Sequence, residues 1–206
     1  VSLYHHGAFS STDPDECLRR INDRLTKATG ELRTLDLLVI TWGTAWVYRY
    51  TRENIVVSNC HKIPSQEFER SRLSVEDIVK EYLVLIGRLR EINPGLRILF
   101  TVSPIRHWKD GAHGNQLSKA TLLLAIDRLR EELQHVYYFP AYEIVLDELR
   151  DYRFYADDML HMSGFTVDYI WERFLYSFIS PEVLGLMNQI GRVNKGVAHR
   201  PFDPQS

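Results

Sequence analysis

The sequence predicts an α/β protein built around a mostly parallel sheet. Three short apolar runs have the length of strands, and segments with helical periodicity separate them. The runs cover residues 37–41, 97–102 and 136–139. Polar loops follow the strands in this order, and the loops at the carboxyl ends of parallel strands are where such proteins bind ligands.

The first helix is expected to begin at Pro14, because Asp13 is a capping residue and proline suits the first turn. Its apolar residues recur on one helical face, and Gly30 is the expected stop. That face consists of Cys17, Leu18, Ile21, Leu25 and Ala28. The following run, 37–41, is continuously apolar, which is typical of a strand buried on both faces.

Residues 46–50 and 55–57 flank a polar turn and predict a hairpin. Ser74 and Asp77 predict a capping box for the next helix, which ends at 93–95.

A glycine-rich loop is expected over 110–114, and another long helix over 116–134. Beyond the third apolar run, residues 142–149 predict one or two helical turns, and Ser163 is a suitable cap for the helix after it. A last helix is expected from Pro181, followed by a proline-bounded extension.

Length and composition favour one globular domain spanning 1–206. The net charge of −2 gives no electrostatic case for binding nucleic acid or an anionic membrane, and no apolar run is long enough to span a bilayer. Cys17 and Cys60 do not make a disulfide framework, so a reducing, cytoplasmic location is expected.

Asp158 and His161 are the main candidates for catalysis. A hydrolase base takes a proton from its nucleophile and is held in the correct tautomer by an acid. Two residues between Asp and His, on a loop, can place both side chains on one side. The alternative is that Asp158 caps a turn and His161 is an ordinary surface residue.

A polar cluster at Asn59, Cys60 and His61 offers a second set of candidates. A thiolate needs a histidine close in space, but neighbours in an extended chain point to opposite sides, so Cys60 is expected to be a small packed residue. The Asn59 amide could donate to a developing oxyanion, and His61 beside it is a candidate for binding the oxyanion or the substrate.

Arg106 and His107 follow the second apolar run, so they could bind an anionic group or polarise a carbonyl; a solvated pair of cations is the alternative. The chain has eight histidines, but their spacings match no known set of metal ligands. Six of them are candidate ligands: His5, His6, His61, His107, His113 and His161. No metal site is therefore expected.

Several motifs along nearly the whole chain resemble the GSCFA domain family. They are GTAWVYR at 43–49, NCHK at 59–62, TVSPIRH at 101–107, KDG at 109–111, FPAYEI at 139–144, DELRDYRFY at 147–155 and HRPF at 199–202. Runs of this length are far more specific than an isolated Asp-x-x-His.

That family resembles the SGNH (GDSL-like) hydrolases. The resemblance implies a three-layer α/β/α, flavodoxin-like fold and ester hydrolysis through an acyl-serine of a Ser-His-Asp triad. It makes His161 the general base and Asp158 the residue that orients it. Gly43 falls in the Gly-x-Asn oxyanion block, but Ala45 stands in place of the Asn, and Asn59 is the substitute expected here.

The Gly-Ser-Cys-Phe-Ala motif that names the family, and that carries its nucleophile, is absent. The chain is therefore expected to lack the first strand and nucleophile block, to be inactive as it stands, and to expose an apolar strand edge. The candidate serines within the chain are Ser10, Ser58 and Ser103, and none matches the motif.

The leading hypothesis is a serine esterase or O-deacetylase acting on a small-molecule or carbohydrate acyl ester. No organic cofactor is expected, because the chain has no glycine loop that would cradle a phosphate. One alternative is a non-catalytic binding or interaction domain on the hydrolase scaffold. Another is a thiol enzyme that uses Cys60 and His61.

Overall fold

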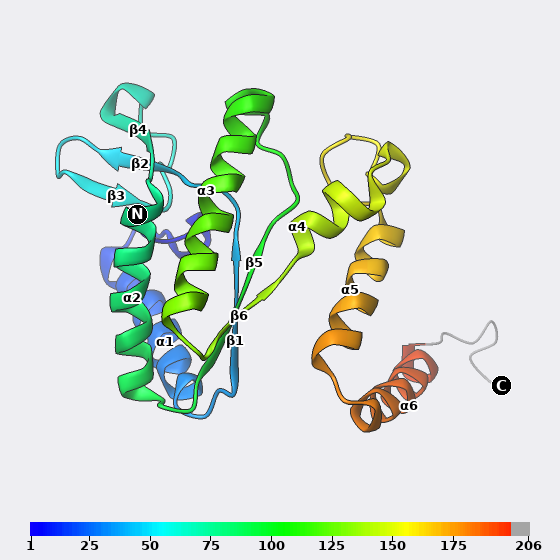
Figure 1. Cartoon of the computed structure of the whole chain (residues 1–206). Helices are drawn as coiled ribbons and strands as arrows, with labels where there is room; N and C mark the ends of the chain where they lie inside the picture. Colours follow the sequence, from blue (N-terminus) through cyan, green and yellow to red (C-terminus); the bar gives the residue numbers. More distant parts are fainter. Residues whose placement is uncertain (199–206) are drawn as a thin grey trace, which may run out of the picture. The chain divides into compact units, whose positions relative to one another are not determined.

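The computed structural model describes residues 1–198 (Figure 1). The chain divides into two compact units, the first being Val1–Glu143 and the second beginning at Ile144. Each unit is described by itself, and the single domain expected over 1–206 stays a prediction. The HRPF motif at 199–202 and the extension that contains it lie outside the described residues.

A three-stranded parallel sheet organises the first unit, in the order β1-β5-β6. Its strands are β1 (Leu37–Trp42), β5 (Arg97–Val102) and β6 (Val136–Phe139). Apart from Arg97 at its start, every residue of β5 is buried, as expected for the middle strand. All three strands lie on the apolar runs expected to form them, and the predicted α/β class with a parallel sheet is confirmed.

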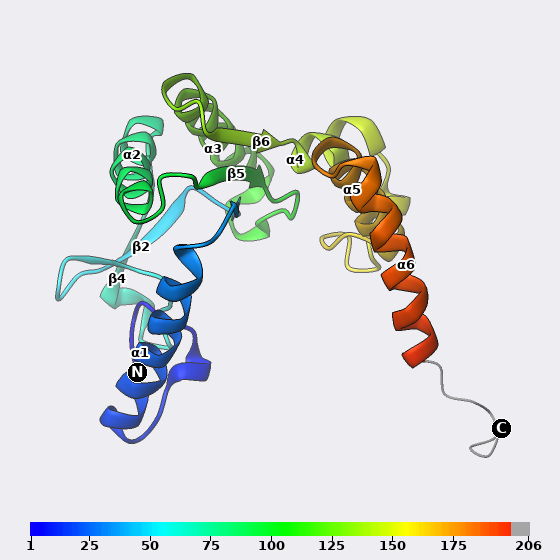
Figure 2. The ribbon, with the colours of Figure 1, turned by 90° about the horizontal axis from the view of Figure 1, so that it is seen from below.

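Two helices, α2 (Val75–Ile92) and α3 (Gly111–Glu132), lie side by side against the sheet (Figure 2). The Trp42 ring of β1 packs 4.7 Å from both Tyr82 of α2 and Phe100 of β5, measured between ring centroids. The Trp42 indole N–H also donates to the Tyr82 hydroxyl at 2.8 Å. The arrangement of sheet and helices is compatible with a three-layer α/β/α fold.

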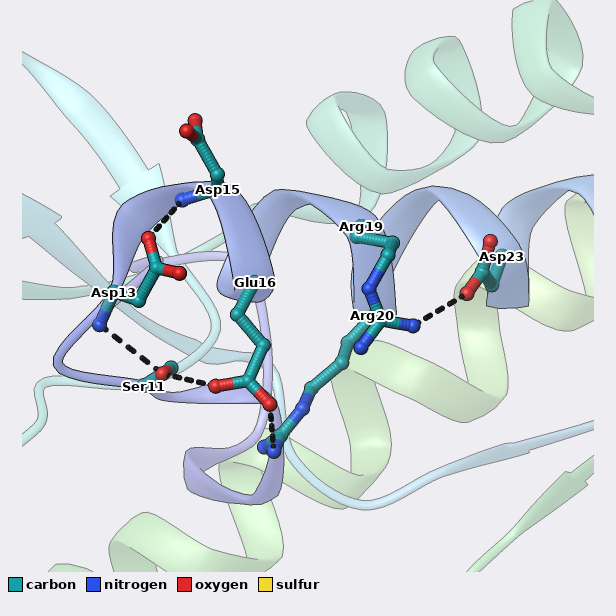
Figure 3. A network of polar contacts seen from close by, with 7 residues as sticks. All are labelled: Ser11, Asp13, Asp15, Glu16, Arg19, Arg20 and Asp23. Carbon is teal, nitrogen blue, oxygen red and sulfur yellow. Dashed lines mark hydrogen bonds and ion pairs between the residues drawn. The ribbon is translucent and has the colours of Figure 1, made fainter.

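Helix α1 (Pro14–Leu32) begins as expected, because the Asp13 side chain accepts a hydrogen bond from the Asp15 N–H. Polar contacts line the start and the first turns of this helix (Figure 3). The contacts join Ser11 to Glu16, Glu16 to Arg20, and Arg19 to Asp23.

The end of α1 and the extent of its apolar face differ from expectation. The helix continues past Gly30 to Leu32, so glycine alone does not stop it. Only Cys17 and Ile21 are buried, whereas Leu25 is 53% exposed. The pattern predicted an amphipathic helix correctly, but of the expected face only Cys17 and Ile21 are covered, and Leu18 is exposed as well.

Strand β1 lies at one edge of the sheet, and in residues 1–198 it pairs only with β5. Val39 is 49% exposed, and Thr41 on the same face is exposed too. The expectation that both faces of this strand are buried is therefore wrong, because a continuous apolar run does not distinguish an edge strand from a central one. The apolar strand edge expected from the sequence is present here.

A second, antiparallel sheet follows β1 in the chain, in the order β3-β2-β4. The predicted hairpin is confirmed as β2 (Trp46–Tyr50) and β3 (Ile55–Val57), while β4 (Phe68–Arg72) was not expected. The short 3₁₀ helices of this unit are Gly7–Phe9, Ser65–Glu67 and Trp108–Asp110.

The capping box of α2 is confirmed, since Ser74 and Asp77 exchange hydrogen bonds. The glycine-rich loop expected over 110–114 is wrong, because α3 already begins at Gly111. Gly111 has a φ of 65°, a left-handed conformation that glycine adopts without strain, and this residue turns the chain into the helix.

The first unit closes with a short helix, α4 (Ala141–Glu143). The second unit begins with the helical turns expected there, a π-helical segment, Ile144–Leu149, and a 3₁₀ turn, Tyr152–Phe154. Helix α5 (Gly164–Phe178) starts at the predicted cap, Ser163, and α6 (Pro181–Ala198) follows it. No helix within residues 1–198 combines the length and the apolar character needed to cross a bilayer.

Candidate functional site

The second unit carries the Asp158 and His161 pair on a closed loop between the 3₁₀ turn and α5. An isolated bridge between Tyr155 and Met162 closes this loop, and the Ala156 N–H donates to the His161 carbonyl at 2.8 Å. Met159 takes a left-handed φ of 58° inside it. These contacts turn the chain so that the side chains of residues 158 and 161 meet.

The Asp158 carboxylate is held by three hydrogen bonds. One oxygen, Oδ1, accepts from the backbone N–H of Leu160 and of His161, both at 2.9 Å. The other, Oδ2, lies 2.5 Å from His161 Nδ1. Because the backbone fixes the carboxylate, the pair is better oriented than an ordinary surface contact between two flexible side chains.

This arrangement has consequences for both side chains. The hydrogen bond from His161, followed by those of the two backbone N–H groups, lowers the pKa of Asp158 from 3.8 to about 2, so the carboxylate is ionised at neutral pH. An ionised carboxylate only accepts hydrogen bonds, so Nδ1 of His161 carries the proton between the two groups. Nε2 is then the ring nitrogen that can take up a proton from a reactant. His161 is 64% exposed and therefore accessible to a reactant.

In the first unit, the loops that follow β1 and β5 meet at the carboxyl edge of the parallel sheet. A Cβ placed on Gly43 would lie 3.7 Å from Nε2 of His107, so these two predicted residues are neighbours. Arg106, the next candidate, belongs to the same loop after β5 and is half-buried. The expectation that polar loops collect at this edge is confirmed for these two loops.

Three buried polar side chains of α3 hold both loops, and we call them the α3 clamp: Asn115, Ser118 and Lys119. Asn115 Oδ1 accepts from the His107 N–H at 3.0 Å. Ser118 Oγ accepts from the Ala45 N–H at 2.8 Å and lies 3.0 Å from the Thr44 hydroxyl.

The Lys119 ammonium completes the clamp by donating to the carbonyls of Gly43 and Ser103, both at 2.6 Å. Burial lowers the pKa of Lys119 from 10.5 to about 8. None of these three residues was expected from the sequence. Their spacing could have identified them, because residues 115, 118 and 119 lie on the same helical face as the apolar residues 122, 126 and 129. Polar residues on a face expected to be buried indicate polar contacts inside the protein.

Asn59 and His61 lie together in the loop after β3. The Asn59 side-chain oxygen accepts from the His61 N–H at 2.9 Å, which leaves the Asn59 amide NH₂ as the donating end. His61 Nε2 lies 2.8 Å from the Ser2 carbonyl and 3.0 Å from that of His5. Carbonyls only accept, so Nε2 carries a proton here, and the ring joins this loop to the start of the chain.

The remaining alternatives gain no support from the described residues. Cys60 is half-buried, and its neighbour His61 uses Nε2 to donate, so that atom is not placed to take a thiol proton. Within residues 1–198 no three His, Cys, Asp or Glu side chains come together as metal ligands. Ser103, one of the serines considered, accepts from the Ile105 N–H through Oγ at 3.3 Å.

The fold and these loops define an α/β protein with a parallel sheet, polar loops at its carboxyl edge, and an oriented Asp–His pair. A model of the GSCFA family matches residues 1–174, and the chain belongs to this family. Searches among curated proteins and among solved structures found no match. This match confirms the resemblance of the sequence motifs to the GSCFA family.

Proposed function

We propose that this protein is a serine ester hydrolase of the SGNH type, in which His161 is the general base and Asp158 orients it. The observation that carries the proposal is the 2.5 Å contact between Asp158 Oδ2 and His161 Nδ1, on a carboxylate that two backbone N–H groups also hold. A surface aspartate that only caps a turn would not need to bind the imidazole as well.

The proposed reaction follows the logic of acyl transfer. A serine Oγ attacks the ester carbonyl while His161 Nε2 takes its proton, and Asp158 stabilises the imidazolium that forms. The imidazolium then gives this proton to the alkoxide as the ester C–O bond breaks. The alcohol departs, and the acyl group stays bound to the serine. Water, deprotonated by the same histidine, attacks the acyl-serine and releases the acid and the serine.

The groups proposed to bind the oxyanion and the substrate are Gly43, Asn59, Arg106 and His107. His61 supports the loop that carries Asn59. Ala45 cannot act as a side-chain donor, so the Asn59 amide is proposed in its place. The proposed substrates are acyl esters of small molecules or carbohydrates.

The test is hydrolysis of small acyl esters by the full-length protein and four variants. His161→Ala and Asp158→Asn should lower kcat/KM by about 10²- to 10⁴-fold, the range for loss of a general base or of its orienting acid. The matched controls are His113→Ala and Asp157→Asn, an exposed histidine on α3 and the carboxylate next to Asp158, and both should keep wild-type rates. Equal rates for His161→Ala and His113→Ala would overturn the proposal.

A further inference from the structure

Within residues 1–198, the Lys119 ammonium has no acidic partner, although it lies in the interior of the first unit. Lys119 is 1% exposed, and burial is the cause that lowers its pKa. Burying a charge costs free energy unless it is compensated. Here the compensation comes from two backbone carbonyls, those of Gly43 and Ser103.

Holding the two loops together does not by itself require a charge. Asn115 and Ser118 already bind the same two loops through neutral groups. Lys119 adds a hydrogen bond from an ammonium, which is stronger than a neutral one and polarises the group that accepts it.

The polarised group is the peptide between Gly43 and Thr44. The Gly43 carbonyl accepts from the ammonium, and the N–H of the same peptide belongs to Thr44. Within residues 1–198, no hydrogen bond from the Thr44 N–H is found, whereas the next two N–H groups, of Ala45 and Trp46, are both bonded. This N–H is therefore free to donate.

We propose that Lys119 is a positioning residue that fixes and polarises the Gly43–Thr44 peptide, so that the Thr44 N–H donates to an oxyanion at this edge of the sheet. The inference rests on the proposed ester hydrolysis and deepens it. It supplies a donor in the block where Ala45 has replaced the expected asparagine. Preorganised backbone N–H groups are the usual means of stabilising the charge that develops in acyl transfer.

The activity test compares Lys119→Met with Lys119→Arg and with Lys80→Met, a control that removes an exposed lysine from α2. Lys119→Met should lower kcat by about 10²-fold with little change in KM, because an oxyanion donor acts in the transition state. Lys119→Arg keeps the charge and should recover part of kcat, while Lys80→Met should match the wild type. A loss in Lys119→Met that appears only in KM would overturn the inference.

The second readout is the pH dependence of kcat, because only the charged form of Lys119 polarises the Gly43–Thr44 peptide. The titratable groups around the ammonium are Tyr142 of α4, whose ring centroid is 5.9 Å away, and His107, which borders Gly43. Below pH 8 Lys119 is charged, so the wild-type kcat should fall as the pH rises through about 8. Lys119→Met should lack this fall.

A measurement without substrate separates this inference from the proposed function. In the wild type, the Thr44 amide resonance should shift with a midpoint near pH 8, and the shift should be absent in Lys119→Met. A Thr44 resonance that does not move in the wild type would overturn the inference, whatever the activity. The wild-type titration is decisive even where Lys119→Met does not fold, and absence of ester hydrolysis in the wild type would refute only the proposed function.

Discussion

The Asp110 and Arg70 side chains form an ion pair that joins β4 to the segment just before α3, next to the His107 loop. The Asp110 side chain is fully buried, whereas that of Arg70 is 25% exposed. Arg70 also stacks over the Trp46 ring, with its guanidinium carbon 4.2 Å from the ring centroid. We predict the effect of replacing Asp110 by leucine, which removes the carboxylate and leaves the guanidinium in place.

The size of the effect follows from the burial of the two partners. Breaking a buried ion pair on one side costs about 3–5 kcal/mol, because the remaining charge is desolvated and uncompensated. Arg70 keeps some contact with water and its stacking on Trp46, so the low end, about 3 kcal/mol, is expected for Asp110→Leu. For a chain of this size that is a fall in melting temperature of about 6–12 °C.

The pair itself is not fully satisfied. Arg70 Nε and Asp110 Oδ2 are buried without a hydrogen-bond partner in the described part of the chain. Replacing both side chains, in the double variant Arg70→Met with Asp110→Leu, should therefore recover most of the lost stability.

Urea and thermal unfolding of the wild type, both single variants and the double variant would measure the coupling between the two residues. We expect the double variant to be more stable than Asp110→Leu. A double variant that loses the sum of the two single losses would refute this reasoning, because the residues would then act independently.

Three further predictions follow from individual residues. The Asp158 carboxyl should titrate near pH 2 in the folded protein, below its usual pKa of 3.8. The stability that this carboxylate contributes is present above the unfolded pKa and is lost as the pH falls toward 2. Replacing His161 by alanine should raise the titration midpoint of Asp158 measured by carbon NMR. Ser118→Ala should destabilise the fold by about 1–3 kcal/mol in urea unfolding, because the Ala45 N–H loses its buried acceptor. Phe100→Ala should cost about 3–5 kcal/mol by the same assay, since Phe100 is fully buried in the middle strand.

The parallel sheet could be predicted from the sequence because its three strands are short apolar runs between helical segments. Strand β4 could not, because Phe68–Arg72 is largely charged and does not resemble a buried strand. Its Arg70 packs by stacking on Trp46 and pairing with Asp110, so a charged residue takes the place of an apolar one. A buried role for a charged residue such as Arg70 can be recognised only when its partners from other segments of the chain are known.

The candidate site could be predicted in part. The spacing of Asp158 and His161 was sufficient to suggest their contact, because both lie on one loop. The α3 clamp was missed because Lys119 is usually an exposed residue type, and nothing local indicates that two carbonyls, 76 and 16 positions away in the chain, accept its hydrogen bonds. Whether the Asp158 loop serves the edge that carries Gly43 stays a prediction.

The most direct test of the proposed function is covalent labelling of the full-length protein by a fluorophosphonate probe, with the modified residue identified by mass spectrometry. We expect the wild type to be labelled on a single serine. His161→Ala should be labelled far more slowly, while His113→Ala should be labelled at the wild-type rate. A folded wild-type protein that takes up no label would refute the proposed serine hydrolysis and would favour a ligand-binding domain on the same scaffold.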